Sequence, residues 1–292
     1  MKIGFIGGGR VGKAYGKFLK SSGYEVLGYF SRTNKSAKEA ASFAGTAWYE
    51  NIEEISRDAD MLFLTVNDDQ IRKVSETLAD LGVVRAGTVV VHMSGALGSD
   101  ILSALKNKGC HTYSLHPLLS FAEPAKACSR IKEAVFSLEG DSEKMEFMTR
   151  FLKETGCEFF IIDTKKKALY HAAACVASNY VTVLLDYAFS LYGDMGLSRE
   201  DAAKALLPLV KGTVQNAEDG GPDKTLTGPI SRGDSSVIQR HMEAFSELPK
   251  DKEEFYRFMG LQTADYVSRY GLQPEEKINE IIKILKRGEL NG

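Results

Sequence analysis

Three polar side chains in this sequence occupy positions suited to handling protons and reacting oxygen atoms. Ser94 in "HMSGALG" and His116 in "LHPLLSF" each follow a short apolar run, and Lys167 opens a long helical pattern. A hydroxyl can hydrogen-bond a reacting oxygen, and an imidazole or an ammonium group can deliver a proton to it. We therefore expect these three residues to be catalytic. The structural alternatives are a helix N-cap for Ser94 and a hydrogen-bonded turn residue for His116.

The helix that Lys167 opens carries further polar groups. At about 100° per residue, its apolar face holds Leu169, Ala173, Val176, Tyr180 and Leu184. The opposite face holds Lys167, His171, Ser178 and Thr182, with Asn179 at its edge. This face is poor in charge, which favours the wall of a cleft over a solvent-facing surface. Lys167 and His171 would lie together near the reacting end of a cofactor, and Asn179 would hydrogen-bond the substrate oxygen.

A glycine-rich turn near the N-terminus predicts that this cofactor is a dinucleotide. The turn fits G-x-G-x-x-G and consists of Gly7, Gly8, Gly9, Arg10, Val11 and Gly12. It follows the strand-like "KIGFI" and opens a helical pattern, which is the context that dinucleotide binding requires. Gly7 permits the tight turn, Gly9 lets the backbone approach a pyrophosphate, and Gly12 lets the helix pack close to the sheet. The N–H groups of the helix N-terminus would face the phosphates. The alternative is a glycine-rich turn without a ligand.

The end of the second predicted strand favours NADP over NAD. An NAD site usually has Asp or Glu there, about 20 residues beyond the glycines. This chain has Ser31, Arg32 and Thr33 instead. A guanidinium group can stack on adenine and pair with a 2′-phosphate, and the two hydroxyl groups add hydrogen-bond donors. The alternative is that Arg32 is a solvated loop residue.

Other strand ends should border the same cofactor, because the carboxyl ends of strands line the ligand crevice of a doubly wound sheet. The residues expected there are Thr65, Val66, Asn67, Ser94 and Gly95. Asp68 or Asp69 is expected to cap the helix that follows Asn67.

The order of the elements predicts an α/β fold with an N-terminal doubly wound domain and an all-α C-terminal domain. Strand and helix patterns alternate up to residue 163, which is typical of a parallel sheet covered by helices on both faces. Long helical patterns follow, and the candidate N-caps among them are Ser198 for one helix and either Asp234 or Ser235 for another. We place the domains at residues 1–163 and 164–292, since 292 residues exceed what one core usually holds.

The irregular segment "LTGPISRGDSS", residues 226–236, is the candidate site for a substrate carboxylate. Thr227, Gly228 and Arg232 could supply hydroxyl, backbone N–H and guanidinium donors. A structural connection in which Arg232 pairs with Asp234 is the alternative.

Composition excludes several other classes of protein. The chain is 43% hydrophobic and 26% charged with a formal net charge of −2, so it has no general attraction for nucleic acid or anionic membranes. The N-terminus lacks a signal-peptide pattern, and polar residues interrupt the apolar run 168–185, so we expect a cytoplasmic protein without a membrane span. Four widely spaced cysteines indicate reduced thiols and no metal site.

These motifs together resemble a known superfamily. A Rossmann domain followed by a helical domain with Lys and Asn on its first long helix is similar to 6-phosphogluconate dehydrogenase, pyrroline-5-carboxylate reductase, ketopantoate reductase and prephenate dehydrogenase. More closely, "HPLLSFA", "YHAAACVASNY" and "LTGPISRGD" resemble a Rossmann-like oxidoreductase family with a C-terminal domain of unknown function. The resemblance implies that Ser94 and His116 hold a reacting hydroxyl, that Lys167 works with His171 or Asn179, and that the chain forms homodimers.

The expected activity is NADP-dependent reduction of a small 2-oxo acid, and the resemblance makes ketopantoate the leading substrate. Reduction of an imine, as in pyrroline-5-carboxylate reductase, is an alternative that needs no strong acid in the site. A non-catalytic NADP-binding sensor is another.

Overall fold

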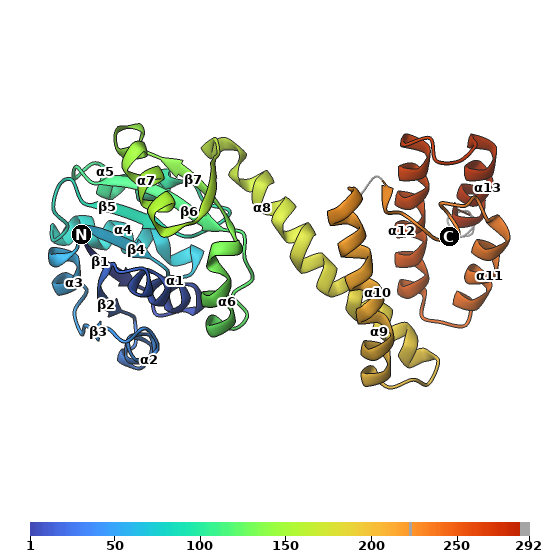
Figure 1. Ribbon diagram of the computed structural model, residues 1–292, viewed down its shortest axis with the longest axis horizontal. Coiled ribbons are helices and arrows are strands. Elements are labelled where there is room, and N and C mark those ends of the chain that lie inside the picture. Colours follow the sequence, from blue (N-terminus) through green and yellow to red (C-terminus); the bar gives the residue numbers. More distant parts are fainter. Residues whose placement is uncertain (222–223, 287–292) are drawn as a thin grey trace. The chain divides into compact units, whose positions relative to one another are not determined.

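The computed structural model describes residues 1–221 and 224–286, which form two compact units (Figure 1). The first unit runs from Met1 to Tyr180 and the second from Val181 to the C-terminus. The predicted boundary at residue 163 stays a prediction, but the first unit also includes the helical segment that follows its last strand.

The first unit is built on an eight-stranded sheet with the order β3-β2-β1-β4-β5-β6-β7-β8. Neighbouring strands are parallel except for the antiparallel pair β6–β7. The strands are β1 Lys2–Ile6, β2 Glu25–Phe30, β3 Ala47–Trp48, β4 Met61–Leu64, β5 Val89–His92, β6 His111–Pro117, β7 Val135–Gly140 and β8 Glu158–Ile161.

Two details of this sheet differ from the prediction. The predicted strands do not include β3, which is only two residues long. The sheet is also not wholly parallel, because β7 pairs with β6 in the antiparallel direction. The connection from β6 to β7 contains the short helix α6, Pro124–Arg130, and a 3-10 turn. Alternating strand and helix patterns do not indicate strand direction, because a connection that contains a helix can join either parallel or antiparallel neighbours.

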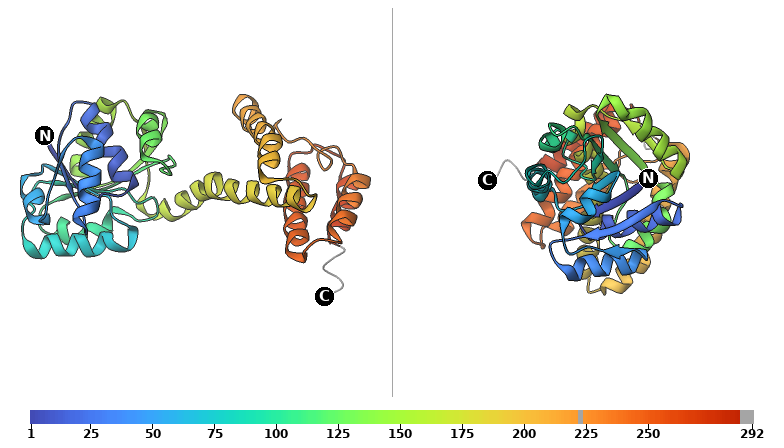
Figure 2. Two further views of the ribbon diagram at one scale, coloured as in Figure 1. Left: turned by 90° about the horizontal axis from the view of Figure 1, so that it is seen from below. Right: turned by 90° about the vertical axis from the view of Figure 1, so that its left-hand side faces the viewer.

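Helices cover both faces of the sheet, as predicted (Figure 1; Figure 2). These helices are α1 Arg10–Ser21, α2 Asn34–Ala44, α3 Ile52–Asp58, α4 Asp68–Leu81, α5 Ser103–Lys106, α6 and α7 Met145–Thr155. Phe5 and Phe63 pack into one core cluster with the apolar face of α1, and Ile6 and Leu64 pack into a second cluster with α4. Strands buried on both faces are typical of α/β folds.

A helical run follows β8 and crosses the division between the units. It consists of α8, Lys167–Cys175, a π-helical turn, Val176–Tyr180, and α9, Val181–Asp194. Residues 164–194 are long and apolar enough to cross a membrane by length and composition alone, but none of the most apolar stretch is buried. This exposed helix is not a membrane span, since Ser178, Asn179 and Asp186 interrupt it.

The second unit is wholly helical over its described residues, which confirms the fold class. After α9 come α10 Arg199–Gly220, α11 Ser235–Phe245, α12 Lys250–Arg269 and α13 Glu275–Lys286. Its core lies between α11, α12 and α13 and includes Ile238, Val267 and Ile281. The predicted N-caps hold, because Ser198 accepts a hydrogen bond from the N–H of Asp201 and Asp234 accepts one from Val237.

Candidate functional site

The glycine turn after β1 has the geometry of a dinucleotide-binding loop. Gly7 has φ +114°, and a Cβ there would lie 2.5 Å from the carbonyl oxygen of Thr65. A Cβ at Gly12 would lie 2.5 Å from both the Gly7 oxygen and Thr65 Oγ1. The Thr65 hydroxyl donates to the Gly7 oxygen at 2.7 Å and so fastens the turn to the end of β4. Gly9 caps α1 without a side-chain hydrogen bond, so the first N–H groups of this helix can face an anion.

The hydroxyl-rich end of β2 contacts this turn. The N–H of Gly8 donates to Ser31 Oγ at 3.4 Å, and Thr33 caps α2 by accepting from the N–H of Ser36. Arg32 between them is exposed. Within the described ranges, no ion pair is formed by Arg32, so its guanidinium group can meet a phosphate. These residues therefore fit an NADP cofactor.

The segment after β4 connects the glycine turn to the next strand. Asn67 is the N-cap of α4, without a side-chain bond, and Val66 precedes it half-buried. The expectation that Asp68 or Asp69 caps this helix is wrong, because both lie in its first turn. Asp68 instead accepts a hydrogen bond from Ser94 Oγ at 2.7 Å.

The loop after β5 is held in place by Ser94 and by a histidine that the sequence analysis missed. Ser94 Oγ also accepts from the N–H groups of Ala96 and Leu97 at 3.3 and 3.2 Å, so it caps a turn and not a helix. His92 is fully buried, and its Nδ1 accepts from the N–H of Ser94 at 3.2 Å. The proton must therefore sit on Nε2, which donates to the carbonyl of Gly98 at 3.0 Å. Burial lowers the pKa of His92 to about 4 and keeps it neutral.

Lys167 binds the same loop from the start of α8. Its Nζ donates to the Ser94 carbonyl at 3.3 Å and to Ser114 Oγ at 2.7 Å, and the side chain is 1% exposed. Burial lowers the pKa of Lys167 to about 8, although the carboxylates of Glu139 and Asp68 oppose this shift. At neutral pH the site therefore contains a buried cation next to the predicted Ser94–Gly95 position.

His116 and His171 lie on either side of Gly95. A Cβ at Gly95 would lie 2.8 Å from His116 Nε2 and 2.4 Å from His171 Cδ2, so only glycine fits between the two rings. His116 Nδ1 is 2.8 Å from the Tyr170 hydroxyl group, a partner that the sequence analysis missed. Burial, together with the charges of Lys167 and His171, lowers the pKa of His116 to about 4. At the sheet's carboxyl edge, then, a neutral imidazole and a buried ammonium group lie close to one glycine.

The remaining predicted residues belong to the π-helical turn and to the second unit. Asn179 is exposed in the π-helical turn, about two turns beyond His171. In the second unit, Thr227 lines a cavity of about 480 Å³ together with Thr213, Thr225 and Thr263. Gly228, at φ +107°, accepts from the Ser231 hydroxyl, and the exposed Arg232 follows it in the same turn.

Little in the local sequence marks the missed residues. Ser114 and His116 occupy alternate positions of β6, and Ser94 lies two residues beyond His92, the last residue of the neighbouring strand β5. This alternation was the available signal for His92 and Ser114. Among the described residues, no three His, Cys, Asp or Glu side chains are placed to share a metal ion.

Comparisons with known proteins agree with this architecture. Residues 1–117 match the model of a Rossmann-like domain, and residues 134–263 match that of a domain of unknown function, DUF2520. No curated protein sequence matches the chain.

The matching solved structures cover nearly the whole chain. A provisionally assigned NADP oxidoreductase from Bacteroides fragilis has 20% identity and a TM-score of 0.71, covering 97% of this chain and 98% of its own. A protein from Thermotoga maritima has 24% identity and a TM-score of 0.63, covering 98% and 99%. A reductive aminase from Aspergillus terreus, solved with NADPH and ethyl-5-oxohexanoate, has 14% identity and a TM-score of 0.61, covering 100% and 94%. Pyrroline-5-carboxylate reductases from Coxiella burnetii and Streptococcus pyogenes also match.

At these identities the solved structures establish a common fold, shared with NADP oxidoreductases, pyrroline-5-carboxylate reductases and imine reductases. The chain consists of a Rossmann-like N-terminal domain followed by a DUF2520 domain.

Proposed function

We propose that this protein is an NADPH-dependent reductase of a small carboxylic acid, with a 2-oxo acid such as ketopantoate as the leading substrate. The supporting observation is the arrangement around Gly95, where the buried Lys167 ammonium group and the His116 imidazole lie beside the carboxyl ends of β5 and β6. A cofactor held at the glycine turn would reach this point across the end of β4. Thr65 contacts Gly7, and Asp68 contacts Ser94, in the same short segment.

The proposed NADP site assigns each part of the cofactor to residues already described. The turn from Gly7 to Gly12 and the N-terminus of α1 would hold the pyrophosphate. Arg32, with Ser31 and Thr33, would hold the 2′-phosphate. When bound, the nicotinamide supplies the hydride, so the protein's task is to orient the substrate and manage charge and protons.

Lys167 and His116 divide that task between them. The Lys167 cation is charged at neutral pH and would stabilise negative charge that develops on a substrate oxygen near Gly95. His116 is neutral, and donation from the Tyr170 hydroxyl to Nδ1 leaves the ring proton on Nε2, the nitrogen nearest Gly95. Nε2 could therefore give its proton to the developing alkoxide while Nδ1 takes the proton of Tyr170. Burial raises the pKa of Tyr170, so its phenolate would regain a proton from solvent before the next turnover.

The substrate carboxylate is assigned to Thr227, Gly228 and Arg232 of the helical unit, where hydroxyl, backbone N–H and guanidinium donors share one turn.

We also propose that the chain forms a homodimer through apolar helix faces. Exposed apolar residues recur along helices of the second unit, with Val183 58%, Leu209 65% and Val214 60% exposed. Monomeric proteins rarely expose so much apolar surface. Light scattering coupled to size exclusion should give twice the chain mass.

Imine reduction is the second candidate. It is favoured by the fold shared with imine-reducing enzymes and by the neutrality of His116, because a protonated imine brings its own proton. The test is NADPH oxidation at 340 nm with a panel of 2-oxo acids and cyclic imines, in the wild type, His116→Ala and Tyr170→Phe. For an oxo acid, loss of His116 should lower kcat by about 10²-fold or more. An unchanged rate in His116→Ala with an imine alone would select the second candidate. NADPH binding without turnover of any compound would indicate a sensor.

A further inference from the structure

A buried carboxylate lies next to the site but outside the reaction described above. Glu139 is near the end of β7, is 2% exposed and stands opposite Ser114 of β6 in the antiparallel register. An ionised carboxylate is costly to bury unless hydrogen bonds satisfy it. The distribution of its hydrogen bonds therefore indicates what Glu139 is for.

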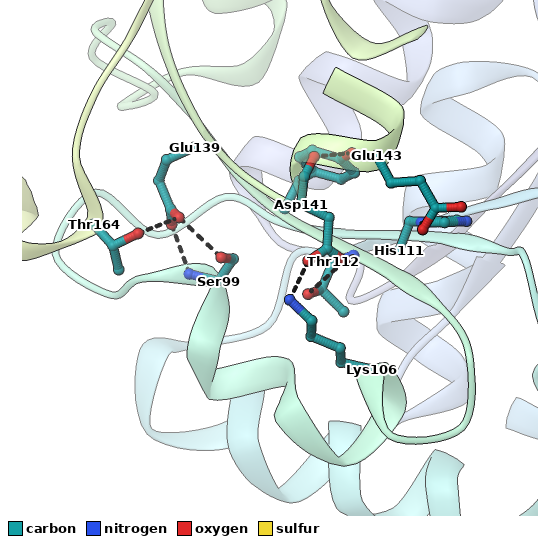
Figure 3. Close-up of polar contacts among 9 residues, drawn as sticks. Ser99, Lys106, His111, Thr112, Glu139, Asp141, Glu143 and Thr164 are labelled. Carbon is teal, nitrogen blue, oxygen red and sulfur yellow. Dashed lines mark hydrogen bonds and ion pairs between the residues drawn. The ribbon is translucent and has the colours of Figure 1, made fainter. Parts of the chain in front are cut away.

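Those hydrogen bonds connect two segments that are distant in the sequence (Figure 3). The N–H of Ser99 donates to Oε1 at 2.6 Å, and the Ser99 hydroxyl donates to Oε2 at 2.8 Å. The Thr164 hydroxyl also donates to Oε2, at 2.8 Å. Ser99 ends the loop that begins at Ser94, and Thr164 begins the turn that leads into α8. The two segments are in close contact, since a Cβ at Gly98 would lie 2.4 Å from Thr164 Cγ2.

The loop and the helix are thus joined at two points. Lys167 joins them at the Ser94 carbonyl, and Glu139 joins them at Ser99. The carboxylate also favours the charged form of Lys167, against the effect of burial. Without Glu139, the loop that carries Gly95 would keep only its Ser94 end attached to α8.

We propose that Glu139 is a positioning residue for the reduction, which holds the Ser94–Ser99 loop against the start of α8 so that Lys167 and His171 keep their places beside Gly95. The proposal rests on the function proposed above. Glu139 does not contact the substrate in it and acts only through the loop and the helix.

A second carboxylate on the same strand end provides a matched control. Asp141 accepts from the N–H of Thr112 at 2.8 Å and pairs with Lys106, which ties β6 to α5 (Figure 3). Its hydrogen bonds reach neither the Ser94–Ser99 loop nor α8 in the part of the chain that the structure describes. Asp141→Asn therefore removes a carboxylate at this edge but leaves the hydrogen bonds of Glu139 to Ser99 and Thr164 in place.

The kinetic test compares Glu139→Gln and Thr164→Val with Asp141→Asn and Thr164→Ser. Glu139→Gln and Thr164→Val should lower kcat by about 10-fold or more, while KM for NADPH stays within about twofold because the glycine turn is intact. Thr164→Ser keeps the hydroxyl and should keep kcat, and so should Asp141→Asn.

The pH profile distinguishes positioning from a general loss of structure. The groups that face Lys167 are Glu139 of β7, Asp68 of α4, His92 of β5, His116 of β6 and the Tyr170 ring of α8. Glu139→Gln removes one of the two carboxylates, so the pH at which activity falls on the alkaline side should move lower than in the wild type. Thr164→Val keeps the Glu139 carboxylate. It should therefore lower kcat without shifting the pH at which activity falls on the alkaline side.

Hydrogen–deuterium exchange gives a readout that does not depend on turnover. Peptides covering residues 94–99 should exchange faster in Glu139→Gln and Thr164→Val than in the wild type, but not in Asp141→Asn. The proposal would be overturned if kcat and exchange were unchanged in both Glu139→Gln and Thr164→Val. It would also be overturned if Asp141→Asn lowered kcat as much as these two variants do. A wild type that reduces nothing in the panel would overturn the proposed function, and loop exchange would then decide alone whether Glu139 holds the loop.

Discussion

Replacement of Lys167 by methionine should separate activity from stability. Methionine approximates the lysine side chain as far as Cε and lacks the ammonium group. Burial lowers the pKa of Lys167 from 10.5 to about 8, and each unit corresponds to about 1.36 kcal/mol. Keeping the ammonium group charged at pH 7 therefore costs the folded state about 3 kcal/mol. Methionine relieves that cost but removes two hydrogen bonds, to the Ser94 carbonyl and to Ser114, at about 1 kcal/mol each. Lys167→Met should be as stable as the wild type at pH 7, or more stable by about 1 kcal/mol.

The difference in the free energy of unfolding between the wild type and Lys167→Met should change sign with pH. Between pH 8 and 10.5, the unfolded chain binds a proton at Lys167 that the native state has lost. The free energy of unfolding of the wild type should therefore rise relative to Lys167→Met by about 3 kcal/mol across this window. Urea unfolding of both proteins at about pH 7 and pH 10, followed by circular dichroism, gives the two differences, because other titrating groups cancel between them.

Activity should change in the opposite direction. Loss of a preorganised charge that stabilises a transition state typically lowers kcat by about 10²–10³-fold. Lys166→Met is the matched control, since it makes the same change at the exposed neighbouring residue. If Lys167→Met is less stable than the wild type by about 3 kcal/mol at pH 7 and keeps its kcat, the cation is structural and the reasoning fails.

Three further outcomes are expected. Burial lowers the pKa of both His92 and His116 from 6.5 to about 4. The free energy of unfolding of the wild type should therefore fall by up to about 3 kcal/mol per histidine as the pH falls from 6.5 to about 4. Urea titrations should show a smaller fall for His92→Gln. Gly12→Ala should weaken NADPH binding by about 10-fold or more in fluorescence titrations, because its Cβ would collide with the glycine turn, whereas Gly193→Ala, in open space, should not. Gly95→Ala should lower kcat without weakening NADPH binding, because its Cβ would displace the two histidine rings and leave the glycine turn intact.

Features of the fold that depend on local patterns could be predicted from the sequence. The glycine turn was recognised because a strand precedes it and a helix follows it, and Gly7 does adopt a positive φ. The apolar face of α1, which includes Tyr15 and Leu19, is buried as its spacing requires. The two-residue strand β3 has no such pattern, and the alternation of strands and helices does not indicate that β7 runs antiparallel to β6.

The contacts within the site could not be predicted, because they join residues that are distant in the sequence. Ser114 and Lys167 are 53 positions apart, and Asp68 and Ser94 are 26 apart. Glu139 resembles any glutamate of a strand until the fold brings Ser99 and Thr164 to it. Polarity at a strand end indicates the edge of a sheet where a site can form, but the pairing of side chains there is set by tertiary structure.

The polar stripe of α8 shows how the two kinds of information combine. A helix normally buries its apolar face, yet here Lys167 on the polar face is 1% exposed and Leu169 on the apolar face is 77% exposed. Lys167 points inward because its hydrogen-bond partners are the Ser94 carbonyl and Ser114 at the end of the sheet. Burying a lysine without a directly paired carboxylate costs stability, so a chain that served only to fold would be better off with an apolar residue at this position. The cost is understandable if the ammonium charge is needed beside Gly95, which is why the stability of Lys167→Met is as informative as its activity.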